Sequence, residues 1–145
     1  MILLDANLLI YAHVESFTQH PRARRWVDAQ LSGEVPVGIP WVSVIAFLRI
    51  VTNPRVFERP APIDDAWRQV RDWLSADVSW VPEPTARHAD VLGSLLAATG
   101  AHAALIPDAH LAALAIEHGL ILQSADRDFA RFPRLRWNNP LAGER

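Results

Sequence analysis

The amino-acid sequence predicts an α/β fold of three layers, in which helices flank a mainly parallel central sheet. Two observations lead to this expectation. Short apolar runs of the kind found in buried strands alternate with longer segments of helical periodicity. Glycines and prolines also stand where several of the helical segments should end. Strands that alternate with helices in this way are typical of a parallel sheet covered on both faces.

Short apolar runs predict the strands of this sheet. The first run opens the chain and stops at Asp5, and the second is closed by Pro40. The last run, next to Pro140, is a candidate edge strand. In chain order, the predicted strands are residues 1–4, 35–39, 78–81, 120–122 and 136–137.

Apolar residues spaced three or four apart predict the helices between these strands. Pro21 suits the first turn of one helix, and Thr85 is the expected N-cap of another that stops at Gly100. A further helix is expected to begin at Asp108 and to end at Gly119. The predicted helical segments are 7–12, 21–31, 42–51, a helix from residue 64, 85–99 and 108–118, with a helical turn at 126–132.

Composition limits the class of protein. The 145 residues fit a single domain spanning 1–145, and the 50% apolar content with six tryptophans predicts a packed core. The lack of cysteine excludes a disulfide framework, a thiolate zinc site and a cysteine nucleophile. The first apolar run is too short for a signal peptide or a membrane span, so we expect a cytoplasmic protein with no membrane partner. Most tryptophans are expected in the core, and Trp137 is a candidate for stacking on a base.

Aspartates stand at three separate points where a predicted strand ends or a predicted helix begins. Asp5 follows the first strand, and Asp126 and Asp128 follow the fourth. Asp108 comes after Pro107 at a predicted helix start. Because the carboxyl ends of parallel strands share one edge of the sheet, side chains from these distant positions can meet in one pocket.

Clustered carboxylates repel one another unless a proton or a hard divalent cation neutralises them. The pattern therefore predicts a Mg²⁺ or Mn²⁺ site that activates water and offsets charge on a phosphate. Taken singly, each aspartate is more often only a helix N-cap. The sequence has no Gly-x-Ser-x-Gly, Walker A or Gly-x-Gly-x-x-Gly motif, which argues against an α/β-hydrolase, a P-loop enzyme and a dinucleotide enzyme.

Four segments resemble one known family. They are LLDANLLIYA at 3–12, FLRIVTNPRVF at 47–57, DAHLAALAIEHG at 108–119 and SADRDFARFPRLRWNNPL at 124–141. In this set and order, the chain resembles the PIN-domain ribonucleases, specifically the VapC toxins of bacterial type II toxin–antitoxin systems. The resemblance covers nearly the whole chain.

This resemblance implies a PIN-like fold and a Mg²⁺-dependent endoribonuclease that cleaves structured RNA, such as tRNA or rRNA, to arrest growth. It also implies a homodimer inhibited by a cognate VapB-like antitoxin, and the apolar helices between residues 21 and 51 agree with a buried interface. By position, the family's catalytic, metal-binding acids match Asp5, Asp108 and Asp126. The supporting residues match Asn7, Ser124 and Asp128.

One position departs from the family pattern. Many PIN nucleases carry a glutamate two residues before an arginine on the helix after the second strand, and Phe47 stands there, two residues before Arg49. The departure leaves open one metal against two, and a PIN-like RNA-binding module with weakened activity is an alternative. A dehalogenase-like phosphohydrolase is a weaker alternative, because Asn7 takes the place of its second aspartate and the chain has no lysine.

Overall fold

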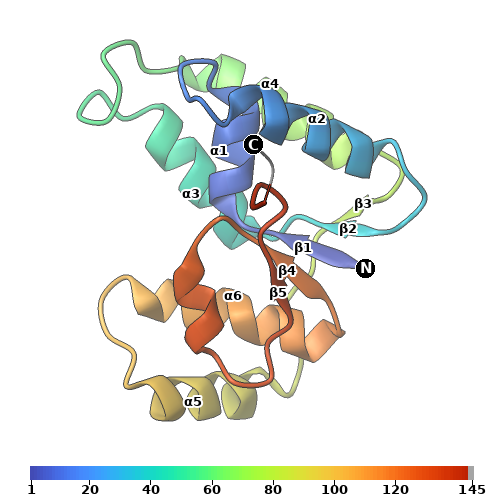
Figure 1. Ribbon diagram of the computed structural model, residues 1–145, viewed down its shortest axis with the longest axis vertical. Helices are drawn as coiled ribbons and strands as arrows, with labels where there is room; N and C mark the ends of the chain where they lie inside the picture. Colours follow the sequence, from blue (N-terminus) through green and yellow to red (C-terminus); the bar gives the residue numbers. More distant parts are fainter. Residues whose placement is uncertain (144–145) are drawn as a thin grey trace.

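A five-stranded parallel sheet lies at the centre of the computed structural model, which describes residues 1–143 (Figure 1). The strand order is β3-β2-β1-β4-β5, and every neighbouring pair is parallel. The strands are β1 (Ile2–Leu4), β2 (Val37–Gly38), β3 (Ser79–Trp80), β4 (Ile121–Gln123) and β5 (Trp137–Asn138). The predicted α/β class and its parallel sheet are confirmed, and each strand lies within one residue of, or inside, a predicted apolar run.

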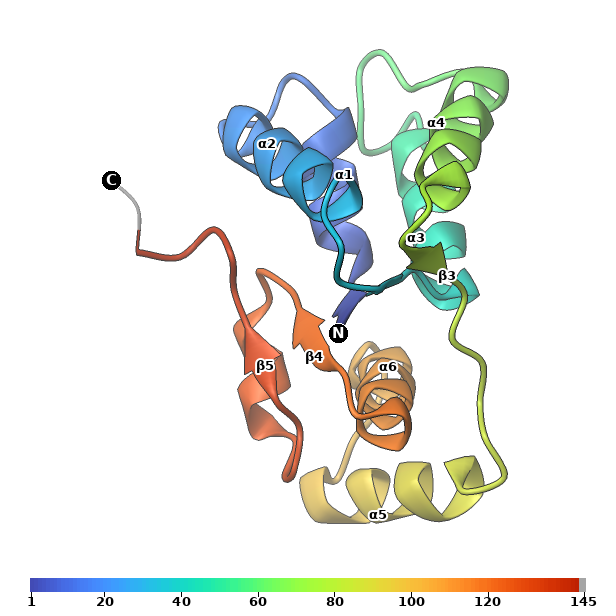
Figure 2. The same ribbon diagram turned by 90° about the vertical axis from the view of Figure 1, so that its right-hand side faces the viewer.

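Helices cover both faces of the sheet. They are α1 (Ala6–His13), α2 (His20–Leu31), α3 (Trp41–Val51), α4 (Ile63–Ser75), α5 (His88–Thr99), α6 (Leu105–His118) and the 3₁₀ helix η1 (Arg127–Arg131). Figures 1 and 2 show α1 to α4 on one side and α5 with α6 on the other, which gives the three predicted layers. None of the helices in residues 1–143 has the length and apolar character needed to cross a membrane.

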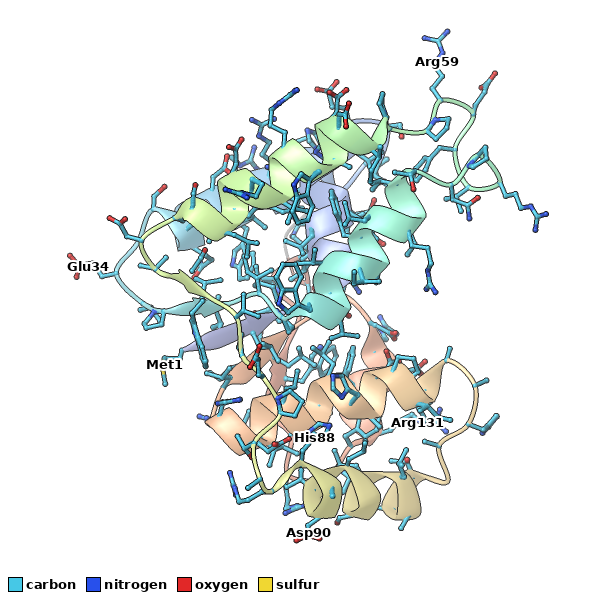
Figure 3. All side chains as sticks on the ribbon, turned by 180° about the vertical axis from the view of Figure 1, so that it is seen from behind. Met1, Glu34, Arg59, His88, Asp90 and Arg131 are labelled. Atoms are coloured by element: carbon cyan, nitrogen blue, oxygen red, sulfur yellow. The ribbon has the colours of Figure 1, made fainter. Side chains whose placement is uncertain are left out.

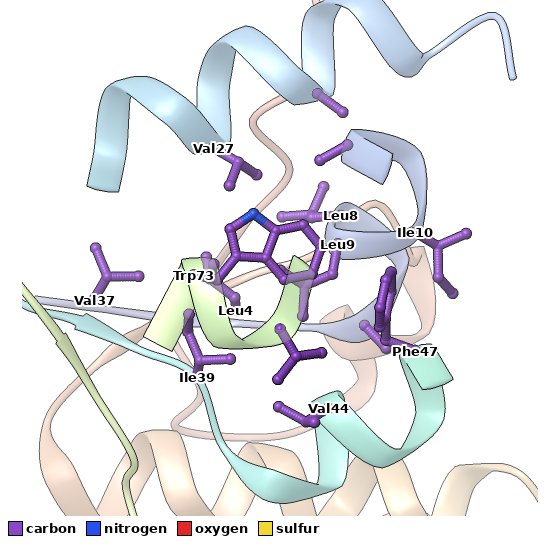
Figure 4. Packing of buried hydrophobic residues seen from close by; sticks show 14 of the residues in the cluster. Leu4, Leu8, Leu9, Ile10, Val27, Val37, Ile39, Val44, Phe47 and Trp73 are labelled. Carbon is purple, nitrogen blue, oxygen red and sulfur yellow. The ribbon is translucent and has the colours of Figure 1, made fainter. Parts of the chain in front are cut away.

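The core is divided by the sheet into two clusters. Alternate side chains of β1 enter opposite clusters: Leu4 packs under α1 to α4, and Leu3 packs under α5 and α6. Both leucines are fully buried, as expected for the middle strand of a sheet covered on both faces. The first cluster is shown in Figure 4, where Phe47 and Trp73 lie among aliphatic side chains.

The strand order creates a switch point between β1 and β4. From β1 the chain moves through β2 to β3 in one direction, whereas β4 and β5 lie on the other side of β1. Leu4 and Gln123 are paired at the carboxyl ends of these two central strands. The residues that follow, Asp5 and Ser124, are therefore placed side by side where ligands bind in open α/β sheets.

The structure corrects the predicted start of α5. The helix begins at His88, three residues after Thr85, and Arg87 occupies the N-cap position. The Thr85 hydroxyl accepts a hydrogen bond from the Arg87 amide over 3.1 Å, so it caps the turn that leads into the helix. Gly100 ends the helix as predicted, with a left-handed φ of 60°.

The start of α6 also differs from the prediction. The helix begins at Leu105, so Asp108 lies inside its first turn and is not its N-cap. Pro107 fits in this turn because the first amides of a helix have no partner within the helix, and proline has no amide to lose. The carboxylate of Asp108 is therefore free of the capping role that the sequence allowed.

Candidate active site

Asp5 and Ser124 meet at the switch point of the sheet. Asp5 follows β1 and is the N-cap of α1, where its Oδ1 accepts a 2.7 Å hydrogen bond from the Ala6 amide. Its other oxygen, Oδ2, accepts a 2.7 Å hydrogen bond from the hydroxyl of Ser124. Ser124 follows β4 and is fully buried. Asp5 is therefore the N-cap of α1 and also holds a fixed position at the edge of the sheet where ligands bind.

The Ser124 hydroxyl links three of the residues predicted from sequence. Besides donating to Asp5, it accepts hydrogen bonds from Asn7 Nδ2 at 3.1 Å and from the Asp126 amide at 3.0 Å. These contacts use the one donor and both acceptor sites of a hydroxyl. Asn7 also accepts from the Ala125 amide at 3.3 Å, which ties the start of α1 to the loop after β4.

Asp126 and Asp128 lie at the start of η1. Asp126 Oδ1 accepts a 2.9 Å hydrogen bond from the Asp128 amide and caps this short helix. Asp126 is half-buried, whereas Asp128 is exposed. Asp126 is joined to Asp5 through Ser124, and Asp128 lies at the outer edge of the group.

Asp108 approaches the same place from α6. It shares with Asp5 the lining of a small cavity of about 80 Å³. The rest of the lining is Ala6, Val42, Ser43, Ala46, Pro107 and Leu111. The structure therefore brings carboxylates from the ends of β1 and β4 and from the first turn of α6 to one part of the surface.

Negative charge accumulates at this place. Burial, and then the charges of Asp5, Asp126 and Asp128, raise the pKa of Asp108 to about 6. Burial also raises the pKa of Asp5, and the charge of Asp126 adds to this, while hydrogen bonds from Ser124 and Ala6 oppose it. A proton or a cation would relieve the repulsion among these carboxylates.

The donor atoms fit a hydrated hard cation better than a closed metal cage. Within residues 1–143, no three His, Asp or Glu side chains converge closely enough to enclose a metal ion as they stand. The acids supply carboxylate oxygens only, which suit Mg²⁺ and Mn²⁺. Mg²⁺ keeps several waters and takes only one or two carboxylates, so it does not require an all-protein cage.

Phe47, which stands at the position of the family's glutamate, packs in the core. Its side chain is fully buried in the first core cluster and does not line the cavity of Asp5 and Asp108. Its ring packs edge-on against Trp73, with centroids 5.0 Å apart (Figure 4). It also packs edge-on against the His13 ring, at 5.4 Å. Ala46, the residue before Phe47 on α3, does line the cavity of Asp5 and Asp108. Phe47 therefore does not occupy an acid-facing position, and Ala46 does.

A buried glutamate and two histidines form a second polar cluster that the sequence analysis missed. Glu117 has no exposed side-chain surface, and its Oε1 accepts hydrogen bonds from the amide and hydroxyl of Thr85 at 2.9 and 2.7 Å. Its Oε2 lies 2.5 Å from Nδ1 of His88, whose Nε2 lies 3.0 Å from Nδ1 of His110. Figure 3 shows His88 where α5 meets α6.

One signal for this cluster was present in the sequence. His110 and Glu117 are seven residues apart, which places them on the same face of a helix two turns from one another. Burial alone would raise the pKa of Glu117, but the hydrogen bonds from Thr85 and His88 outweigh it and hold that pKa below its ordinary value. Burial, followed by the neighbouring His88, lowers the pKa of His110.

Comparison with known proteins shows the family. The PIN domain model matches residues 2–135. Ribonuclease VapC37 of Mycobacterium tuberculosis is 45% identical over 142 residues, covering 98% of this chain and 99% of that protein. Ribonuclease VapC33 of the same species is 40% identical over 141 residues, covering 97% and 99%.

Solved structures share the fold at lower identity. VapBC2 from Rickettsia felis, bound to a promoter DNA fragment, matches with a TM-score of 0.69 and 19% identity, covering 96% of this chain and 98% of that one. FitAcB from Neisseria gonorrhoeae matches with a TM-score of 0.66 and 20% identity, covering 98% and 99%. The family model and the full-length relatives together establish that the chain belongs to the PIN-domain family and, within it, to the VapC ribonucleases.

Proposed function

We propose that the protein is a metal-dependent endoribonuclease and the toxin of a VapBC-type toxin–antitoxin system, which cleaves structured RNA such as tRNA or rRNA to arrest growth. The observation that carries the proposal is the gathering of carboxylates at the β1–β4 switch point, where burial and the neighbouring acids raise the pKa of Asp108 to about 6. The relatives named as ribonucleases support the same reaction.

The residues divide into ligands and supports. The proposed catalytic, metal-binding acids are Asp5, Asp108 and Asp126, and the supporting residues are Asn7, Ser124 and Asp128. The proposed cation is Mg²⁺, with Mn²⁺ as a substitute. When bound, such a cation offsets charge on the scissile phosphate and lowers the pKa of a bound water.

The chain's own side chains position the acids and the RNA. Hydrogen bonds from Ser124 and Ala6 fix both oxygens of Asp5, so its carboxylate keeps one orientation before the substrate arrives. Arg127 and Arg131 are exposed on η1, directly after Asp126. Their guanidinium groups are suited to charge-assisted contacts with RNA phosphates, and such contacts weaken with salt.

A cleavage assay tests the proposal. Purified protein is incubated with total RNA in Mg²⁺, in Mn²⁺ and in EDTA, and the cut sites are mapped by sequencing of the new ends. We expect cleavage of structured RNA with either metal and none in EDTA. Asp5→Asn protein, purified in parallel, is the control for contaminating nucleases. Undiminished cleavage in EDTA would contradict the proposed mechanism.

We also propose a cognate VapB-like antitoxin and a homodimer. The fold relatives are described as VapBC and FitAB assemblies, which supports an antitoxin partner for this chain. Apolar side chains remain exposed on α3 and α4, where Ile45 is 59% and Ile63 56% accessible, and such patches mark protein contacts. An amphipathic antitoxin segment that brings an arginine to the acids would compete with the metal.

Two measurements test these partners. Light scattering should give twice the chain mass of 16.2 kDa. Coexpression with a small gene upstream should yield a stable complex without ribonuclease activity. A strictly monomeric protein whose activity ignores that gene would remove the toxin–antitoxin proposal and leave the nuclease proposal standing.

One observation keeps the weakened RNA-binding module as a second candidate. Ala46 presents a methyl group to the acid cavity, where a further carboxylate would bind metal more strongly. RNA binding without metal-dependent cleavage would favour this candidate. The phosphohydrolase alternative gains no such support, because Asn7 is held by Ser124 and the Ala125 amide.

A further inference from the structure

A second cavity adjoins the acid cavity. Its volume is about 240 Å³, and it is lined by the start of α3, the segment between β3 and α5, and one face of α6. Val42 lines both cavities, and His110 in the second cavity lies two residues after Asp108 in the first. A group held here is therefore next to whatever occupies the acid site.

The walls of this cavity suit a flat ring. Trp41, the first residue of α3, is 44% exposed and lines the cavity, so it is not one of the tryptophans in the core. Pro82 and Pro84, in the segment between β3 and α5, also line the cavity. His118 of α6 pins this segment through a 2.7 Å hydrogen bond with the Glu83 carbonyl oxygen. An accessible indole beside rigid prolines offers a stacking surface for a planar group.

The polar atoms of the lining are few and one of them is held firmly. The lining residues with polar side-chain atoms are His110, Glu83 and Trp41. His110 is fixed from behind by His88, and His88 by the fully buried carboxylate of Glu117. Glu117 holds the loop at Thr85 by two hydrogen bonds. That role does not require the further contacts from Glu117 to His88 and from His88 to His110 at the cavity.

Size and charge favour one kind of occupant. The cavity is smaller than the roughly 300–1,000 Å³ of drug-sized ligand sites, so it suits a single ring system and not a helix of a protein partner. Glu83 and the nearby acids repel an anion, which excludes a phosphate as the preferred group. A neutral nucleobase meets both conditions, since every base has a face that stacks and an edge that forms hydrogen bonds.

We propose that this cavity is a nucleobase subsite, in which Trp41 stacks on one unpaired base beside the scissile phosphate and His110, positioned by His88 and Glu117, contacts the edge of that base. The inference rests on the ribonuclease function proposed above. It adds that cleavage occurs in unpaired segments and that one position next to the cut carries a base preference set by this cavity.

Trp41→Ala is the first test, with Trp67→Ala as its matched control. Trp67 is 41% exposed on α4 and shares a groove with Trp41, but it does not line the base cavity. Hairpin RNAs with randomised loops are cleaved by each protein, and the cut ends are sequenced. We expect Trp41→Ala to lose the preference at one position and to lower kcat/KM by about 5- to 150-fold, from the usual strength of base–aromatic stacking. Trp41→Phe should restore part of both, and Trp67→Ala should match the wild type.

His88 variants test the positioning role. His88→Leu leaves His110 in place but removes its support, so we expect a weaker base preference and a raised KM with little change in kcat. His88→Gln can still donate and accept, and it should restore part of the preference. A merely structural role would change the melting temperature of both variants and leave the base preference of the folded protein as it is.

A binding measurement keeps the inference separate from the cleavage reaction. Fluorescence anisotropy of a labelled single-stranded RNA is measured with Asp108→Asn protein, alone and combined with Trp41→Ala or Trp67→Ala. Weaker binding from the Trp41 change alone supports the subsite even if no cleavage is found. A wild type that cleaves, with base preference and RNA affinity unaffected by Trp41→Ala, overturns the subsite and leaves the nuclease standing. A changed oligomeric mass with unchanged base preference would assign this surface to a protein contact and also overturns it.

Discussion

The hydroxyl of Ser124 donates to Oδ2 of Asp5 across 2.7 Å and joins two residues that are 119 positions apart in the chain. The bond forms because β1 and β4 pair in a register that sets Leu4 opposite Gln123. The same hydroxyl accepts from Asn7 and from the Asp126 amide, so its hydrogen-bonding capacity is full. One buried oxygen therefore holds both the carboxylate of Asp5 and the backbone at Asp126.

Ser124→Ala should impair both activity and stability. The change leaves Asn7 Nδ2 and the Asp126 amide without this partner and frees one oxygen of Asp5. We expect RNA cleavage to fall by about 10–100-fold, the usual effect of removing a group that orients a metal ligand. The free energy of unfolding should fall by about 1–3 kcal/mol, the cost of buried polar groups left unpaired. Steady-state kinetics in Mg²⁺ and urea unfolding measure the two effects.

Ser79→Ala is the control for a lost serine hydrogen bond. Its hydroxyl donates to the Trp73 carbonyl at 2.6 Å, in β3 at the far edge of the sheet. This variant should lose some stability and keep its rate of cleavage. Equal losses of activity in both variants would show that Ser124 acts through general stability alone.

Asp108 should make the metal-free protein less stable as the pH rises. Its pKa is about 6 in the folded state against 3.8 as the ordinary value, so the folded protein holds this proton when the unfolded chain has released it. Stability therefore falls as the pH rises from about 4 to about 6, and stays lower above that. In EDTA, Asp108→Asn should flatten this fall and melt at a higher temperature than the wild type at pH 7.

Melting curves between pH 4 and 8, with and without Mg²⁺, measure this effect. Added Mg²⁺ should stabilise the wild type most above pH 6, where the carboxylates are charged, and should stabilise Asp108→Asn less. Asp90→Asn removes an exposed carboxylate on α5 and should follow the wild-type curve (Figure 3). A wild type that is equally stable from pH 4 to 8 in EDTA would contradict the proposed repulsion.

Glu117 should affect the pH dependence of stability in the opposite direction to Asp108. Burial opposes its ionised form, but the hydrogen bonds from Thr85 and His88 hold its pKa below the ordinary 4.5. A carboxylate with a lowered pKa contributes stability above 4.5, and this contribution is lost as the pH falls through the folded pKa. Glu117→Gln should therefore melt at a lower temperature at pH 7 and lose less on acidification. Glu34→Gln, at an exposed position, is the control. If the melting temperature of Glu117→Gln falls on acidification as much as that of the wild type, this role is contradicted.

The sequence predicted the parts of the site that depend on strand ends. Asp5 and Ser124 follow β1 and β4 directly, and Asp126 is the third residue after β4. Parallel strands bring such ends together. The position of Asp108 in its helix was harder to predict from the sequence, because Pro107 is compatible with both a helix start and a first-turn position. Either choice leaves the residue near the edge, but only the structure shows that its carboxylate is not a cap.

Other features lay beyond the sequence for physical reasons. The helix α3 is apolar nearly all round, so its hydrophobic pattern does not say which face meets the acids, or that Ala46 lines their cavity and Phe47 does not. The cluster of Glu117 needs a hydrogen bond to His88, 29 positions earlier, and such distant pairings leave no local pattern. The exposure of Trp41 likewise depends on how α3 is placed relative to its neighbours.

The two neighbouring positions on α3 should respond in opposite ways to a new carboxylate. Ala46→Glu adds one at the acid cavity, so the variant should melt at a lower temperature than the wild type in EDTA, because the new charge faces Asp5 and Asp108. It should bind Mn²⁺ more tightly, and a tenfold gain corresponds to about 1.4 kcal/mol more stabilisation at saturating metal. Melting temperatures over a Mn²⁺ titration measure both effects.

Phe47→Glu should lose stability without any gain in metal affinity. It removes a fully buried ring that packs on Trp73, a loss of about 3–5 kcal/mol for phenylalanine, and adds a carboxylate with no partner in an apolar core. Phe47→Leu, which keeps the position apolar, should be milder and should bind Mn²⁺ as the wild type does. Tighter Mn²⁺ binding by Phe47→Glu and none by Ala46→Glu would reverse the assignment of faces on α3. The opposite result would show that the acid-facing position is residue 46, and that the chain carries a methyl group where one more carboxylate can be accommodated.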